Sequence, residues 1–83
     1  MDHQKARELI ADHLSVPVAS VVDDAEFKAD LGADSLDLVE LTMQFEDALN
    51  VTIADDESEH CRYVEDALKL LNYKSAEALS GAR

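Results

Sequence analysis

The chain has 83 residues, of which 47% are hydrophobic, and this suffices for one domain with a modest core and excludes a disordered tail. Nineteen acidic residues against seven basic ones give a formal net charge of −12, which disfavours nucleic acid and anionic membranes as partners. The single cysteine excludes an intramolecular disulfide, and no apolar run resembles a signal peptide or approaches the ~18 residues of a membrane span, so we expect a cytoplasmic protein without membrane insertion.

The first predicted helix covers residues 2–14, with Asp2 as its candidate N-cap. Apolar and boundary residues recur there at helical spacing, namely Ala6, Leu9, Ile10, His13 and Leu14. We interpret His13 as a residue at the edge of the core and not as a metal ligand. Pro17 ends the helical pattern.

A long connection follows over residues 15–33, where no helical period is visible. A structureless segment of this length is unusual in a small domain, so it should be pinned across the helix ends by inward-facing side chains. The candidates for this role are Val18, Val21, Val22, Phe27 and Leu31. A short helical turn is expected around residues 25–30.

The second predicted helix covers residues 35–50 and has two distinct faces. The face expected in the core carries Leu38, Leu41, Thr42, Phe45, Ala48 and Leu49. The opposite face carries Leu36, Glu40, Met43 and Asp47, flanked by Asp37, Val39, Gln44 and Glu46. Residues 29–61 contain no Lys or Arg, so this acidic face either is ordinary solvated surface or meets partners with basic patches, with the Leu–Met pair as apolar anchors.

The C-terminal part predicts a connector with Val51 and Ile53, a short helix near residues 55–61 and a fourth helix over residues 63–73. The core side of the fourth helix carries Val64, Ala67, Leu68 and Leu71. Residues 74–83 show no partner stripe and are expected to form a frayed tail after a domain of residues 1–73. The predicted fold is an all-α four-helix bundle of three longer helices and one short helix, with a long loop between the first two.

The residues exclude most catalytic chemistry. The histidines and Cys61 lack metal-ligand spacing, two distant glycines cannot form a phosphate-binding loop, and Cys61 is expected in or near the core as a small hydrophobe. Ser35 lies between Asp34 and Asp37, where no neighbouring side chain suits the role of its general base. Since Asp34 can cap the helix, the hydroxyl of Ser35 remains available as an attachment point for a group that another enzyme adds.

The stretch FKADLGADSLDLVEL, residues 27–41, resembles the acyl carrier proteins, with D-L-G at residues 30–32 and D-S-L at residues 34–36. The resemblance extends from about Glu8 to Asn72 and is greatest to the discrete, type II, fatty-acid-like phosphopantetheine carriers. Two departures are Ala54, where many members have proline, and Cys61, where an aliphatic residue is usual. These departures bear on which acyl pathway the chain serves.

The resemblance implies a non-catalytic phosphoprotein whose Ser35 receives covalent 4′-phosphopantetheine from coenzyme A through a separate, magnesium-dependent transferase. The thiol of that arm would carry acyl groups as thioesters between enzymes of fatty-acid or related lipid biosynthesis. The chain would act as a monomer that meets phosphopantetheinyl transferase, acyl transferases and ketoacyl synthases through basic patches on them. A phosphodiester at a helix N-terminus meets free N–H groups and the positive end of the helix dipole.

By the same resemblance, the residues that recognise partners would be Asp34, Leu36, Asp37, Glu40, Met43, Glu46, Asp47 and Asp55. Periodicity and analogy together predict an acyl-chain pocket lined by Leu38, Leu41, Phe45, Ile53, Cys61, Ala67, Leu68 and Leu71. Two alternatives stay open: a carrier dedicated to a polyketide or specialised acyl pathway, and an acidic helical interaction protein or nucleic-acid mimic. The second explains the charge but not a serine set between aspartates after D-L-G.

Overall fold

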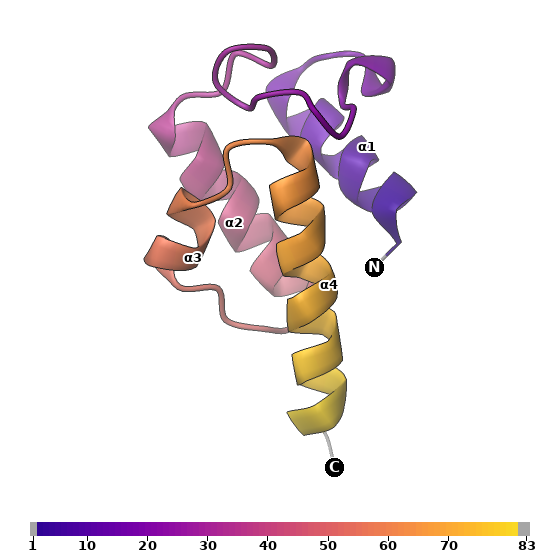
Figure 1. Ribbon diagram of the computed structural model, residues 1–83, viewed down its shortest axis with the longest axis vertical. Coiled ribbons are helices and arrows are strands. Elements are labelled where there is room, and N and C mark those ends of the chain that lie inside the picture. The colour runs from indigo at the N-terminus through magenta and orange to yellow at the C-terminus, as the bar shows by residue number, and fades with distance from the viewer. Residues whose placement is uncertain (1, 82–83) are drawn as a thin grey trace.

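A computed structural model describes residues 2–81, and the side chains of residues 2–75. Its helical elements are α1 (His3–Leu14), the 3-10 helix η1 (Val18–Ser20), α2 (Ser35–Leu49), α3 (Asp55–Glu59) and α4 (Val64–Gly81). Figure 1 shows α2 crossing behind α4, with α1 and α3 on opposite sides of this pair. The predicted all-α bundle of three longer helices and one short helix is confirmed.

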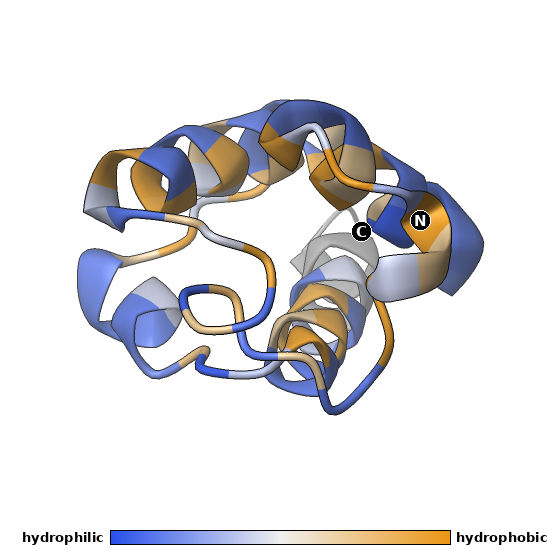
Figure 2. Ribbon diagram, turned by 90° about the horizontal axis from the view of Figure 1, so that it is seen from above, coloured by the Kyte–Doolittle hydropathy of each residue, from blue (hydrophilic) through white to orange (hydrophobic). Residues whose placement is uncertain are grey.

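A single apolar core joins the long helices and the loop between α1 and α2. Ile10, Val21 and Val64 are its largest fully buried side chains, and they come from α1, the loop and α4. Figure 2 shows apolar segments, in orange, in each long helix and along the connecting loop, alternating with hydrophilic ones. Each of these elements therefore contributes to one core, as the predicted periodicity requires.

The first helix begins at the predicted cap. The Oδ1 atom of Asp2 accepts the N–H of Lys5 at 2.8 Å, which satisfies one of the donors that a helix start leaves free. Ser15 ends α1 in the left-handed conformation, with φ of 56°. The bounds predicted from the apolar spacing therefore agree with the structure to within one residue.

The long loop is pinned by fewer side chains than the sequence predicts. Val21, Phe27 and Leu31 are buried as expected, but Val18 and Val22 remain 42% and 45% exposed. The reason is the short turn of η1, which the sequence analysis missed: the N–H of Val21 donates to the carbonyl of Val18, and this turn directs only Val21 inward. The expected helical turn near residues 25–30 is present, since the N–H of Asp30 donates to the carbonyl of Glu26.

Backbone hydrogen bonds tie this loop to the start of α4, and no sequence pattern indicated them. An isolated antiparallel bridge joins Glu26 to Tyr63, and the Glu26 carboxylate pairs with Arg62 at 3.2 Å. The backbone bonds run from Phe27 N–H to the Arg62 carbonyl (3.1 Å), from Val64 N–H to Ala25 (2.9 Å) and from Glu65 N–H to Asp23 (2.9 Å). They satisfy polar groups that a buried loop would otherwise leave unpaired.

The predicted core face of α2 is confirmed in the middle of the helix but is wrong at one position, Ala48, near its end. Leu41 and Phe45 are buried, at 3% and 5% exposure. Ala48 is exposed, so its predicted place in the core is wrong. In this last turn Leu49 packs against the core as predicted, and Val51 joins it because the chain turns at Asn50 and brings Val51 back against the bundle.

The last helix extends beyond its predicted end at Tyr73 and continues to Gly81, where Figure 1 shows it projecting below the other helices. Lys74, which the sequence placed in a partnerless tail, is only 7% exposed, and its ammonium pairs with Glu57 of α3 at 2.9 Å. A lysine can bury its methylenes in this way while its charge is paired. The predicted end of the fourth helix at residue 73 is therefore wrong, since the helix continues through Lys74. Residues 82–83 of the expected frayed tail lie outside the described residues, and its fraying stays a prediction.

Candidate functional site

The turn before α2 brings Ser35 to the surface at a fixed place. Gly32 adopts φ of +72°, a backbone conformation that residues other than glycine rarely adopt. The next residue, Ala33, is buried, and its N–H donates to the carbonyl of Phe27 at 2.8 Å. The chain is thus anchored on the core immediately before α2 begins, which fixes the position of the helix start.

Asp34, and not Ser35, caps α2. Its Oδ1 atom accepts the N–H of Asp37 at 2.8 Å, and the Oδ2 atom of Asp37 accepts the N–H of Asp34 at 3.1 Å. This reciprocal capping box satisfies both backbone donors. The cap predicted for Asp34 is confirmed, and Ser35 becomes the first helical residue, with an exposed side chain that is not needed for the cap.

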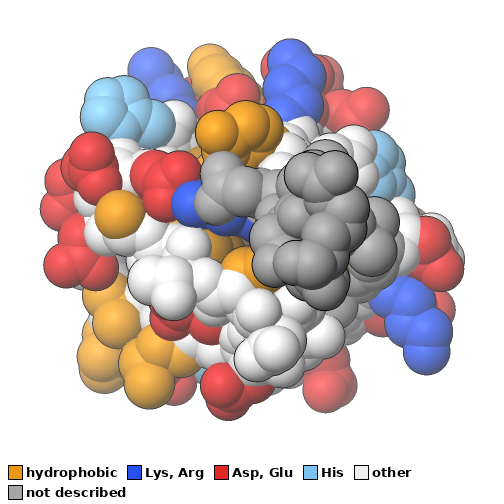
Figure 3. Space-filling model, turned by 90° about the horizontal axis from the view of Figure 1, so that it is seen from below, with side chains coloured by type: hydrophobic (Ala, Val, Ile, Leu, Met, Phe, Trp, Pro, Cys, Tyr) orange, Lys and Arg blue, Asp and Glu red, His pale blue; other side chains and the backbone are white. Residues whose placement is uncertain are grey.

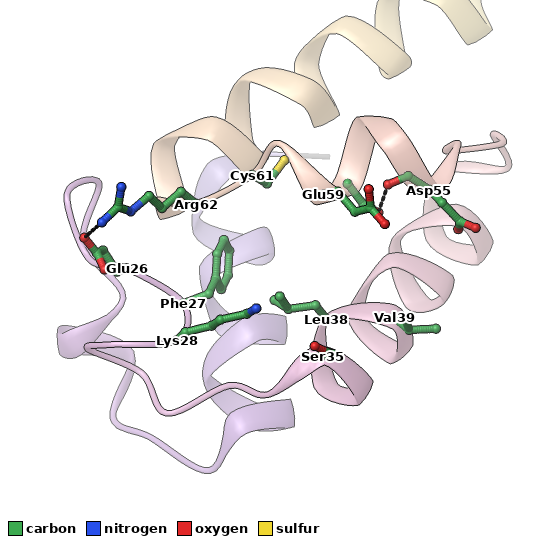
Figure 4. Close-up of a pocket in the computed structure, with 11 residues that line it drawn as sticks. Glu26, Phe27, Lys28, Ser35, Leu38, Val39, Asp55, Glu59, Cys61 and Arg62 are labelled. Carbon is green, nitrogen blue, oxygen red and sulfur yellow. Dashed lines mark hydrogen bonds and ion pairs between the residues drawn. The ribbon is translucent and has the colours of Figure 1, made fainter.

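A groove of about 710 Å³ borders Ser35 and separates the α1–α2 loop from α3. It is lined by Glu26, Phe27, Lys28, Ser35, Leu38, Val39, Asp55, Ser58, Glu59, Cys61 and Arg62. Figure 4 shows Ser35 on one side of this groove, Cys61 on the other, and Lys28 extending between them toward Leu38. The hydroxyl of Ser35 therefore opens onto a space large enough for a flexible group.

A second, apolar cavity of about 40 Å³ lies between α2 and α4. It is lined by Phe27, Leu38, Leu41, Thr42, Phe45, Ile53, Ser58, Cys61, Ala67, Leu70 and Leu71. The groove and the cavity share four lining residues, Phe27, Leu38, Ser58 and Cys61, so the two spaces adjoin at these side chains. Seven of the eight residues predicted for the acyl pocket line this cavity, whereas Leu68 is buried without lining it.

Cys61 stands between the groove and the cavity as a protonated thiol. Burial, with smaller contributions from the negative charges of Asp66 and Glu57, raises the pKa of Cys61 to about 11. Its Sγ atom donates a weak hydrogen bond to the carbonyl of Glu57 at 3.6 Å. A protonated thiol of this kind is a poor nucleophile, and it fits the predicted role of a small hydrophobe near the core.

The face of α2 directed away from the core presents apolar and acidic side chains together. Leu36 and Met43 are 65% and 58% exposed, and Glu40 and Asp47 are exposed beside them. On the face drawn in Figure 3, exposed apolar side chains gather at the lower left with acidic side chains around them, and Lys and Arg side chains lie apart from this group. The structure thus brings together the four residues that periodicity placed on one face.

Four of the predicted recognition residues, Asp34, Asp37, Glu40 and Glu46, also make contacts within the protein, and of these contacts the sequence indicated only the cap at Asp34. Asp34 and Asp37 form the capping box, and the Oε2 atom of Glu46 accepts the N–H of Ile53 at 2.7 Å. Glu46 therefore holds the segment after α2 against the helix. Asp55 lies apart from α2, exposed in the first turn of α3 and at the edge of the groove.

His13 links α1 to the acidic face, a contact that sequence analysis missed. The amide of Gln44 contacts His13 Nδ1 at 2.8 Å, and His13 Nε2 lies 3.7 Å from a carboxylate oxygen of both Asp37 and Glu40. The predicted position at the edge of the core is nevertheless confirmed, since this side chain is 13% exposed. The only sequence signal was a polar residue within an apolar helical spacing.

Comparison with known proteins favours a carrier over the alternative of an acidic interaction protein or nucleic-acid mimic. Residues 4–71 match the family described as "Phosphopantetheine attachment site". The chain therefore belongs to this family, as an acyl carrier protein. Among solved structures, the carrier is similar to the acyl carrier protein from Thermotoga maritima, with a TM-score of 0.77 and 31% identity over 89% of this chain and 86% of that chain.

The carrier is also similar to the acyl carrier protein from Enterococcus faecalis, with a TM-score of 0.75 and 29% identity over 88% of this chain and 92% of that chain. It is a non-catalytic protein that carries 4′-phosphopantetheine and interacts with phosphopantetheinyl transferase and biosynthetic enzymes. The residues of the site fit this group, because an exposed hydroxyl at a helix start adjoins a groove. Across the described residues, every helix is too short or too polar to cross a membrane.

Proposed function

We propose that the carrier holds its 4′-phosphopantetheine arm on Ser35 and delivers fatty-acyl thioesters between enzymes of lipid biosynthesis. The observation that carries this proposal is the position of Ser35: exposed, relieved of capping by Asp34, and bordering the groove that adjoins the apolar cavity. The arm's thiol would form the thioester, and no residue of this chain would take part in that bond. We place the carrier in the cytoplasm, because a reducing compartment keeps the thiol of the arm free.

The attachment is tested by co-expression with a phosphopantetheinyl transferase followed by intact-mass spectrometry. Wild type should gain the mass of one phosphopantetheine, and Ser35→Ala should gain none. Ser58→Ala is the matched control, because Ser58 is the other serine that lines the groove and its hydroxyl donates to the Asp55 carbonyl at 3.0 Å. Loading of Ser35→Ala, or loss of loading in Ser58→Ala, would contradict the assignment.

The cavity favours a hydrocarbon chain over a polar one. Its three polar side chains already use their hydrogens: the hydroxyl of Thr42 donates to the Leu38 carbonyl at 2.8 Å, and Ser58 and Cys61 also donate to backbone carbonyls. A keto group on the bound chain would find no free side-chain donor there. This supports the fatty-acyl assignment over a polyketide one.

The cavity must enlarge to receive such a chain, because about 40 Å³ is little more than the ~30 Å³ share of one water molecule in the liquid. Entry between Leu38 and Cys61 would separate α2 from α3 and α4. Each methylene that becomes buried should add up to about 0.8 kcal/mol to the free energy of unfolding, less the energy needed to separate the helices. Urea titration of carriers loaded with saturated chains and with keto chains of equal length checks this, and equal stability of the two would contradict the preference.

The acidic face of α2 is proposed as the surface that partners bind, with Leu36 and Met43 as apolar anchors and Glu40 and Asp47 as steering charges. Glu40→Lys should slow loading by the transferase, and the effect should shrink as salt screens the charges. Glu8→Lys is the control, since it makes the same charge change on an exposed residue of α1. Equal rates for both variants would show that the net charge matters and the face does not.

A further inference from the structure

Lys28 projects into the groove from a part of the loop that the fold holds in place. Its neighbour Phe27 is buried, donates its N–H to the Arg62 carbonyl at 3.1 Å and accepts the Ala33 N–H at 2.8 Å. Figure 4 shows the side chain of Lys28 extending across the groove toward the end of α2 that carries Ser35 and Leu38. The backbone from which this side chain extends is therefore anchored.

The charge of Lys28 is available in this groove. The other basic residue among the lining side chains, Arg62, pairs with Glu26 at 3.2 Å. Within the part of the chain that the structure describes, Lys28 makes no ion pair, although Asp55 and Glu59 line the far side of the groove. A lysine ammonium offers three hydrogen-bond donors, and these remain for an anion that enters the groove.

The start of α2 needs such a cation once a phosphodiester is attached there. The carboxylates of Asp34 and Asp37 lie on either side of Ser35, and Asp34 already accepts the N–H of Asp37, so it removes one of the donors that a helix start would offer to a phosphate. The added negative charge would therefore meet two carboxylates and a weakened anion site. Of the two basic side chains that line the groove beside Ser35, Lys28 is the one that has no ion pair among the described residues.

We propose that Lys28 binds the phosphodiester of the arm and thereby positions the root of the arm along the groove, toward the entrance between Leu38 and Cys61. This inference rests on the proposed attachment at Ser35. Lys28 lies on the groove side of α2, so the arm would be drawn away from Leu36 and Met43 and would leave the acidic face clear for partners. Lys28 is a positioning residue in this proposal, and it takes no part in any bond to the acyl group.

The strength of this contact sets the kind of experiment. An exposed ion pair changes the ratio of the positions of a flexible group only about twofold to fivefold. Loading rates would not reveal such a change, but spectra that average over the positions of the arm would. The chain has four lysines, Lys5, Lys28, Lys69 and Lys74, so the side-chain signals of ¹³C-lysine-labelled carrier can be assigned by single substitutions. The phosphodiester itself gives one ³¹P signal.

The experiment compares apo and loaded carrier as wild type, Lys28→Gln and Lys69→Gln. Lys69 is the matched control, because it is an exposed lysine of α4 and its substitution changes the net charge equally. Loading should shift the Lys28 Cε signal and leave the Lys69 signal in place. The ³¹P signal should move in Lys28→Gln but not in Lys69→Gln, and that difference should decrease as salt rises from about 0.1 M to 1 M and the Debye length falls from ~10 Å to ~3 Å.

Three results would overturn the proposal, and only one of them also removes the attachment at Ser35. If mass spectrometry places the arm on Ser35 while the Lys28 signal is unchanged by loading and the ³¹P signal is the same in Lys28→Gln as in wild type, the contact does not form and the attachment stands. If the arm is found on another residue, both the attachment at Ser35 and the role of Lys28 fail. A ³¹P shift of equal size in Lys69→Gln would show a general effect of charge and would also reject the contact.

Discussion

Asp34 and Ser35 are adjacent, yet substituting each by alanine should change the free energy of unfolding by different amounts. Asp34→Ala removes the oxygen that accepts the Asp37 N–H at 2.8 Å, while the reciprocal bond from Asp37 to the Asp34 N–H remains. Losing an N-cap of this kind costs about 1 kcal/mol, within a range of roughly 0.5–2 kcal/mol. Ser35→Ala removes an exposed hydroxyl that the cap does not use, and alanine favours helix, so its unfolding free energy should change by less than about 0.5 kcal/mol.

Urea unfolding followed by circular dichroism at fixed pH measures both changes, and thermal unfolding provides a second readout. A loss of about 1 kcal/mol should lower the Tm of a domain of this size by roughly 4–8 °C. Asp34→Asn is the control that separates hydrogen bonding from charge, because asparagine caps about as well as aspartate. If Ser35→Ala proved as destabilising as Asp34→Ala, or if Asp34→Asn lost as much stability as Asp34→Ala, the assignment of the cap to the Asp34 side chain would be refuted.

Two further predictions concern the core and the junction of α3 with α4. Leu41→Ala should lower the free energy of unfolding by roughly 2–5 kcal/mol in urea titrations, because Leu41 is 3% exposed. Leu36→Ala, at a position that is 65% exposed, should change it by less than about 0.5 kcal/mol. Similar losses in the two variants would mean that the faces of α2 are misassigned. The Ala54 N–H and then Lys74 hold the pKa of Glu57 below its ordinary value of 4.5, so this carboxylate adds stability above that pH and the stability is lost as the pH falls through the lowered pKa. Glu57→Gln should therefore flatten the acid side of the stability–pH curve, Glu59→Gln in the same helix should not, and parallel curves for wild type and Glu57→Gln would contradict the linkage.

The sequence predicted those features that a local period or a local cap determines. The start of α1 at Asp2 and the start of α2 at Asp34 both follow from a short polar side chain preceding an apolar period. The burial of Leu41 and Phe45 follows from the same period. These signals lie within a few residues of the position they determine, which is why one sequence was sufficient to find them.

The errors arose where residues distant in the chain decide the outcome. Lys74 is buried because Glu57, seventeen positions earlier, supplies a carboxylate, and periodicity within α4 carries no information about that pairing. Val22 is a different case, because the local turn of η1 leaves it exposed, whereas residues 23–27 of the loop follow hydrogen bonds to the start of α4 and not their own hydropathy. The same bonds anchor Phe27 and so place Lys28 in the groove.

The same distinction between local signals and contacts of distant residues applies to the candidate site. Ser35, its cap and the acidic face lie within α2 and its preceding turn, so the sequence could identify them together. The groove is different, because it needs the α1–α2 loop held against Arg62 and Val64 at one end of α4 while α3 covers the other side. Under the proposed attachment, the arm on Ser35 would gain a defined direction only through that long-range assembly.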